Sequence, residues 1–130
     1  EECVKGRVAV RAGGGDADGA GVKMNDFDNE TWLIEAGDEV IEKQASIGMS
    51  LLTNAERLIY CLWVADYGMR NAGDLETARD LFEPFQAQGR EAAAELNLSH
   101  TLSLFSLPRE EMERDYFDLF DEVCAEIRKL

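Results

Sequence analysis

A row of carboxylates near the C-terminus is the first group of residues whose spacing could do chemistry. Its members are four, three, four and four residues apart, so in a helix they would share one face: Glu111, Asp115, Asp118, Glu122 and Glu126. With a rise of about 1.5 Å per residue, these carboxylates would repeat roughly every 5–6 Å along the helix axis. Such a row could imitate the charges of a nucleic-acid backbone and bind a basic protein. An ordinary solvated helix face has the same spacing, and Glu110 with Arg114 four residues later fits that alternative.

Polar residues also gather where a long apolar helix is expected to end. This set consists of Asp66, Tyr67, Arg70, Asn71, Gly73 and Asp74. Side chains of these types at the exit of a buried helix could line a ligand pocket, and Asp66 and Arg70 at i, i+4 could form an ion pair. The alternative is a capping turn with a surface ion pair that contributes less than about 1 kcal/mol.

The sequence indicates no particular catalytic or metal site. Catalysis by a thiolate would require His100 to meet Cys61 or Cys124, and no third, orienting group is indicated. The sequence has no C-x-x-C pair for zinc and no glycine-rich phosphate-binding pattern. Among 27 acidic residues, no pair stands out as an acid/base couple. We therefore assign no catalytic residue, metal or cofactor, and the sequence favours a protein that is not an enzyme.

Net charge divides the chain into two parts. The 130 residues carry 27 acids and 13 bases, a net charge of −14. The charges cancel in residues 1–23, so the whole excess lies in residues 24–130, with 23 acids and 9 bases. Such a surface repels nucleic acid and anionic membranes and attracts a basic partner. The alternative is that the charge only keeps a cytoplasmic protein soluble.

Residues 1–23 are predicted to form a disordered tail, because their Gly, Ala and Asp residues have little to bury. Met24 directly precedes the expected domain, so one hypothesis is that the natural protein starts there and that the tail is a non-native extension. We see no signal peptide, and charged residues interrupt the most apolar window, Leu51 to Met69, so we expect no membrane span. Together with unpaired cysteines, these features favour the cytoplasm.

Helices must position all of these residues. The stretch from Thr53 to Met69 opens with a capping box, Thr53 with Glu56, and is then apolar on nearly every side. A helix of this kind is buried, with other elements packed around it. We expect it to be the central helix of the domain.

Further helices are expected before and after this one. The first should start after Asp28 or Asn29 and contain Gly37, which could allow a close approach to another helix. The later helices are predicted at residues 75–82, 85–96, 99–107 and about 109–128, with breaks at Pro84 and Pro108. The predicted fold is therefore all-α: a single compact bundle of five or six helices over residues 25–130, around a buried central helix and behind a flexible N-terminal tail.

The segment L-T-N-A-E-R-L-I-Y-C-L-W-V-A-D-Y-G-M-R-N-A-G-D-L resembles one found in small bacterial helical proteins related to the DNA-mimic protein family. Members show a leucine-threonine start, an E-R pair, an apolar helix with Trp, and an acidic-V-N-N-G-G-F turn. The matching residues here are Leu52, Thr53, Glu56, Arg57 and Trp63, with Asn71 and Gly73 in the turn. The turn departs from the family pattern at Gly68, Arg70 and Ala72. The resemblance covers about residues 29–82 and implies an all-α fold, an acidic surface and a protein partner rather than a substrate.

Two functions of different classes follow from the sequence. The favoured one is a protein–protein interaction module that binds a basic, nucleic-acid-binding protein, with DNA mimicry as its special form and no direct binding of nucleic acid or membrane. The alternative is a small enzyme or ligand-binding domain that uses the polar helix exit from Asp66 to Asp74. The sequence determines neither the partner nor the oligomeric state.

Overall fold

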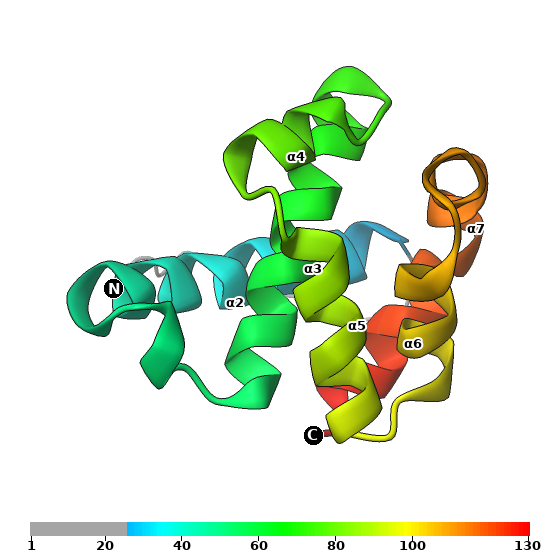
Figure 1. Cartoon of the computed structure of the whole chain (residues 1–130). Coiled ribbons are helices and arrows are strands. Elements are labelled where there is room, and N and C mark those ends of the chain that lie inside the picture. Colours follow the sequence, from blue (N-terminus) through cyan, green and yellow to red (C-terminus); the bar gives the residue numbers. More distant parts are fainter. Residues whose placement is uncertain (1–25) are drawn as a thin grey trace.

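Six α-helices make up residues 26–130, the part of the chain that a computed structural model describes (Figure 1). They are α2 (Asp26–Ile47), α3 (Asn54–Ala72), α4 (Glu76–Leu81), α5 (Phe85–Glu95), α6 (Ser99–Ser106) and α7 (Arg109–Arg128), with a 3-10 turn, η2 (Met49–Leu51), between α2 and α3. The described residues contain no β-strand, so the predicted all-α class is confirmed. The predicted tail, residues 1–23, lies outside the described residues. None of the helices in residues 26–130 combines the length and apolar character that crossing a bilayer requires.

Helix α3 is the predicted central helix, and its ends form as the sequence indicates. The Thr53 hydroxyl accepts a hydrogen bond from the Glu56 N–H (3.1 Å), and the Glu56 carboxylate accepts one from the Thr53 N–H (2.9 Å). At the other end, Gly73 adopts a left-handed φ of 77° and its N–H bonds to the Met69 carbonyl. Helices α2, α4, α5 and α7 all pack against α3, and the prediction of a buried central helix is confirmed.

Helix α2 crosses α3 where Gly37 meets Trp63. A Cβ atom at Gly37 would lie 2.8 Å from the Trp63 Cγ, so the glycine is what lets the two helices come this close. The close approach expected at this glycine is confirmed. Beyond the crossing, residues 41–51 form an arm that projects from the bundle (the cyan-green end at the left of Figure 1), and none of these residues is buried.

The second half of the described chain folds back over α3. Pro84 separates α4 from α5, as predicted, and α5 packs along α3. Helix α6 then approaches α5 closely, since a Cβ atom at Gly89 would lie 2.6 Å from the Phe105 ring. Helix α7 has the predicted bounds, 109–128, and its buried side chains are Met112, Tyr116, Phe120, Val123, Cys124 and Ile127.

Candidate functional site

The predicted carboxylate row lies on α7, but its last member binds another helix of the same chain. Glu126 accepts hydrogen bonds from the His100 N–H (2.8 Å) and from the Thr101 N–H (2.8 Å) and hydroxyl (2.9 Å). Helix α6 has no side-chain cap from its own N-cap residue, Leu98, so Glu126 satisfies the first N–H groups of α6 across the helix interface. Burial alone would raise the pKa of Glu126, but the donors at His100 and Thr101 lower it below its ordinary value. This residue holds α6 against α7.

Two more members of the row also contact side chains of their own chain. Asp115 accepts two hydrogen bonds from the Arg114 guanidinium, at 2.9 and 3.1 Å, which lower the pKa of its carboxyl. The sequence suggested that Arg114 would pair with Glu110. In the structure it bonds to its neighbour Asp115 instead. Glu122 lies 3.4 Å from the imidazole of His100, which is 56 % exposed. Within the described residues, the members that are exposed and make no hydrogen bond or ion pair are Glu111 and Asp118.

A second acidic surface lies on α2 and was not singled out from the sequence. Its four carboxylates are exposed and make no hydrogen bond or ion pair within residues 26–130: Glu35, Asp38, Glu39 and Glu42. We call this set the α2 acidic face. Leu33 and Val40 of the same helix are buried, so the acidic face points away from the core. The signal for it was present in the sequence, because carboxylates spaced by three, one and three residues share one side of a helix.

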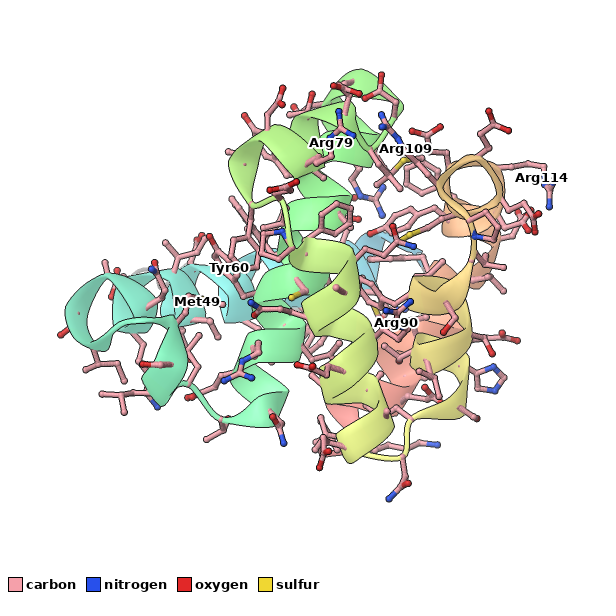
Figure 2. The ribbon with its side chains drawn as sticks, in the orientation of Figure 1. Met49, Tyr60, Arg79, Arg90, Arg109 and Arg114 are labelled. Carbon is pink, nitrogen blue, oxygen red and sulfur yellow. The ribbon has the colours of Figure 1, made fainter. Side chains whose placement is uncertain are left out.

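Several basic residues are already engaged by acids of the same chain. Figure 2 shows Arg79 of α4 and Arg109 of α7 near one another, and the Glu76 carboxylate accepts a hydrogen bond from each, at 3.0 and 2.6 Å. The hydrogen bond from Arg109 is the main reason that the pKa of Glu76 is lowered. On α2, Lys43 forms an ion pair with Glu56 at 2.6 Å. Lys43 is thus paired with Glu56, and the four carboxylates of the α2 acidic face form no ion pair within residues 26–130.

The polar exit of α3 contains a partly buried ion pair, which corrects the expectation of a surface pair. Asp66 is only 5 % exposed and accepts hydrogen bonds from the Arg70 Nε (3.0 and 3.1 Å) and from the Tyr116 hydroxyl (2.8 Å). Burial raises the pKa of Asp66, and the hydrogen bonds from Tyr116 and Arg70 oppose that rise. Asp66 is buried because α7 packs over this end of α3, and helical spacing alone does not reveal this packing.

The Arg70 guanidinium also contacts side chains of two other helices. It lies over the rings of Phe117 (5.0 Å) and Phe120 (4.9 Å) and 3.6 Å from the Glu30 carboxylate. These contacts tie α3 to α7 and α2, since the aromatic rings belong to α7 and Glu30 to α2. Arg70 therefore acts as a packing element between three helices.

The remaining residues of the predicted pocket point to separate places. Tyr67 is 42 % exposed and stacks on Trp63, with ring centroids 5.6 Å apart. The Asn71 amide donates to the Tyr67 carbonyl (2.8 Å), and the Asp74 carboxylate accepts from the Glu76 N–H (3.0 Å) at the start of α4. The structure brings Asp66 and Arg70 together, but none of the predicted pocket residues lines either of the two hollows described next.

Two hollows in the described part of the chain are lined by other residues. The first, which we call the α2–α3 hollow, has a volume of about 250 Å³ and is lined by Ala36, Glu39, Val40, Lys43, Glu56 and Ile59. The second, of about 300 Å³, is lined by Asn54, Arg57, Glu91, Ala92 and Glu95. The α2–α3 hollow shares Glu39 with the α2 acidic face.

The two cysteines of the described residues, Cys61 and Cys124, lie in the core, whereas His100 lies on the surface. Cys61 and Cys124 are fully buried, and burial raises the pKa of the Cys61 thiol to about 12. A thiol with so high a pKa is a poor nucleophile near neutral pH. His100 is half-exposed beside Glu122, at the start of α6. Across residues 26–130, no group of three or more His, Cys, Asp or Glu side chains is placed to hold a metal ion.

Fold and surface define this chain as an acidic, all-α protein. A comparison with known protein families, curated proteins and solved structures finds no match. The resemblance to the DNA-mimic protein family therefore stays a prediction.

Proposed function

We propose that this protein binds a basic surface of another protein, and that the α2 acidic face is the main contact. The observation that carries this proposal is the state of Glu35, Asp38, Glu39 and Glu42, which are all exposed and have no ionic partner among the described residues. Carboxylates of this kind attract lysine and arginine side chains without first having to break an internal pair.

The overall charge supports a protein partner over nucleic acid. Residues 24–130 carry 23 acids and 9 bases, so a phosphate backbone would be repelled and a basic surface attracted. Proteins that bind nucleic acid carry such basic surfaces. A helix fixes its carboxylates at a regular spacing, which is the property that DNA mimicry requires. The α7 row offers fewer free carboxylates to a partner, because Glu126 caps α6 and Asp115 is bonded to Arg114.

The alternative, an enzyme or ligand site from Asp66 to Asp74, has weaker support. Its two central residues, Asp66 and Arg70, bind one another and Tyr116. Groups engaged in this way would have to give up buried hydrogen bonds before they could bind a substrate. We therefore propose the interaction function alone.

Charge reversal at matched positions tests the proposal. The probe is a panel of purified basic DNA- and RNA-binding domains, and the readout is titration calorimetry at low salt and at about 0.15 M salt. Glu35, Asp38 and Glu42 are changed together to Lys in one variant. The control changes Asp80, Glu91 and Glu95 to Lys, which alters the net charge equally on exposed sites of α4 and α5. A third variant changes Asp115, Asp118 and Glu122 to Lys.

The proposal expects the α2 variant to lose at least one domain that the control variant still binds. The α7 variant should show a smaller loss, because Asp115 and Glu122 already contact Arg114 and His100 and only Asp118 has no hydrogen bond or ion pair within residues 26–130. Equal losses in the α2 and control variants would mean that net charge alone attracts the probes, and the proposal would be wrong. Failure of every domain to bind at low salt would also contradict it.

A further inference from the structure

The α2–α3 hollow has an apolar floor and a charged rim. Ala36 and Val40 lie one turn apart on α2, and Ile59 faces them from α3. The ion pair between Lys43 and Glu56, at 2.6 Å, lies on the side of the hollow toward η2. The hollow therefore combines an aliphatic surface with fixed charges, in the angle where the arm leaves the bundle.

Its size suits one side chain better than a small-molecule ligand. Ligand pockets usually enclose roughly 300–1,000 Å³, whereas this hollow measures about 250 Å³ and is open to solvent. An aliphatic side chain of a partner could enter it and contact Ala36, Val40 and Ile59 at once. Burial of such a side chain typically contributes favourable hydrophobic free energy to binding.

Exposed aliphatic residues continue from the hollow along the arm. Ile47 is 39 % exposed and lies on the same side of α2 as Ala36, Val40 and Lys43, at the spacing i, i+4, i+7, i+11. Leu51, in η2, is 66 % exposed. Both side chains are exposed and belong to the arm, which projects from the bundle in Figure 1, so another molecule can reach them.

Charge complementarity selects the occupant. Glu39 belongs to both the hollow and the α2 acidic face, so residues next to an inserted side chain would lie beside carboxylates. A second copy of this chain would bring its own acidic face against the first, and each copy has a net charge of −14. A helix that carries lysine or arginine around one aliphatic residue would instead place its cations beside the carboxylates and its aliphatic side chain in the hollow.

We propose that the α2–α3 hollow receives a bulky aliphatic side chain from a basic helical segment of a partner protein, which the α2 acidic face holds by its lysine and arginine residues. This inference rests on the proposed function and adds the element by which the partner is recognised. Acidic charge then accelerates association and the hollow contributes selectivity.

Two matched peptides and two matched variants test this inference. One peptide is an amphipathic helix of Leu and Lys, and the other has each Leu replaced by Ser, so that the two peptides have equal charge. Ala36→Phe fills the hollow without a change in charge. Ala45→Phe places the same ring on an exposed site of α2 outside the hollow and serves as the control. Circular dichroism and thermal melting check that both variants fold.

The Leu/Lys peptide should bind the unmodified protein about tenfold more tightly than the Ser/Lys peptide at about 0.15 M salt. Ala36→Phe should abolish this difference and Ala45→Phe should leave it unchanged. Amide chemical shifts of the unmodified protein should change most near Ala36, Val40 and Ile59. This mapping needs no variant, so it remains decisive if Ala36→Phe does not fold.

Each other outcome overturns the inference in a recognisable way. Equal affinities for the two peptides, with shift changes confined to Glu35, Asp38 and Glu42, would show that no aliphatic side chain enters the hollow. The proposed function would then still stand. Binding of neither peptide at low salt would contradict both. Self-association that Ala36→Phe abolishes, measured by sedimentation, would identify a second copy as the occupant and overturn the inference.

Discussion

The hydroxyl of Tyr116 on α7 donates a 2.8 Å hydrogen bond to the carboxylate of Asp66 on α3, and both side chains are buried. The two residues are far apart in the sequence, yet their contact ties the last helix to the central one. Arg70 completes this arrangement, because its guanidinium bonds to Asp66 and lies over Phe117 and Phe120. The polar exit of α3 thus joins α3 to α7 through these contacts.

Removal of the Tyr116 hydroxyl should weaken the contact between α3 and α7 and so destabilise the fold. Tyr116→Phe leaves the aromatic packing in place but removes one donor from the buried Asp66, so we expect a loss of about 1–3 kcal/mol in the free energy of unfolding. Tyr67→Phe is the control, because Tyr67 is exposed and stacks on Trp63 through its ring. Urea denaturation measures both variants. A loss no larger for Tyr116→Phe than for Tyr67→Phe would contradict the prediction.

Asp66 should make stability depend on pH in the direction opposite to that of an ordinary paired carboxylate. Burial raises its folded-state pKa above the ordinary value of 3.8, so between these two pKa values the folded protein binds the proton more strongly than the unfolded chain. Its contribution to the free energy of unfolding therefore falls as pH rises through this window. We expect the unmodified protein to lose stability relative to Asp66→Asn as pH rises from 3.8 to the folded-state pKa of Asp66. At higher pH the difference in the free energy of unfolding between the two proteins should stay constant.

Urea denaturation of both proteins across this pH range gives the measurement. The comparison with Asp66→Asn removes the contributions of the other carboxylates, which are common to the two proteins. A stability difference that is independent of pH, or that favours the unmodified protein more as pH rises, would show that Asp66 does not have a raised pKa.

Glu126 should contribute to stability as a cap of α6. Glu126→Ala leaves the N–H groups of His100 and Thr101 without their acceptor, and we expect a loss of about 1–2 kcal/mol near neutral pH. Because its folded-state pKa lies below the ordinary 4.5, this contribution should be present above pH 4.5 and disappear as pH falls through the folded pKa. Hydrogen exchange at His100 and Thr101 should accelerate in the variant.

Glu122→Ala is the matched control for this experiment. Glu122 lies one turn earlier on the same helix, and its ion-pair partner within residues 26–130 is the exposed His100, at 3.4 Å. We expect its stability change to be within about 0.5 kcal/mol of zero, as is usual for exposed pairs. Similar losses at the two positions would mean that Glu126 is an ordinary surface carboxylate.

Gly37 should not tolerate alanine, although alanine usually favours a helix. A Cβ atom at this position would lie 2.8 Å from the Trp63 Cγ, in the centre of the crossing between α2 and α3. We expect Gly37→Ala to lower the free energy of unfolding by about 1–3 kcal/mol, instead of adding about 1 kcal/mol. Denaturation followed by tryptophan fluorescence measures the change. A stabilised variant would show that Trp63 moves aside at little cost.

Much of the fold was predictable because its signals are local. The capping box of Thr53 and Glu56, the left-handed Gly73 and the break at Pro84 act within a few residues of one another, so they set helix ends wherever the helices lie. The long apolar run of α3 likewise implies burial before any neighbour is known. These features are enough for an all-α bundle with a central helix.

The candidate sites were predictable only as faces of helices. Spacing placed Glu126 in one row with Glu111 and Asp118, but the N–H groups that it caps come from another helix. A hint existed in Leu98, which precedes α6 and has no side chain that can cap it. In the same way, the spacing of Asp66 and Arg70 indicated their pair, whereas the partial burial of that pair depends on Tyr116 and Phe120.

The sequence alone thus determined most of the helix positions and that the protein is strongly acidic, because hydrophobic period, capping and net charge are properties of the chain itself. The predicted start of the first helix was wrong, since α2 begins at Asp26 and not after Asp28 or Asn29. Tertiary structure decided which carboxylates bind within the molecule and which face outward. That division depends on contacts between helices such as α6 and α7, and on the projection of α2 beyond its crossing with α3 at Gly37. Contacts of this kind join residues far apart in the sequence, so no local pattern encodes them.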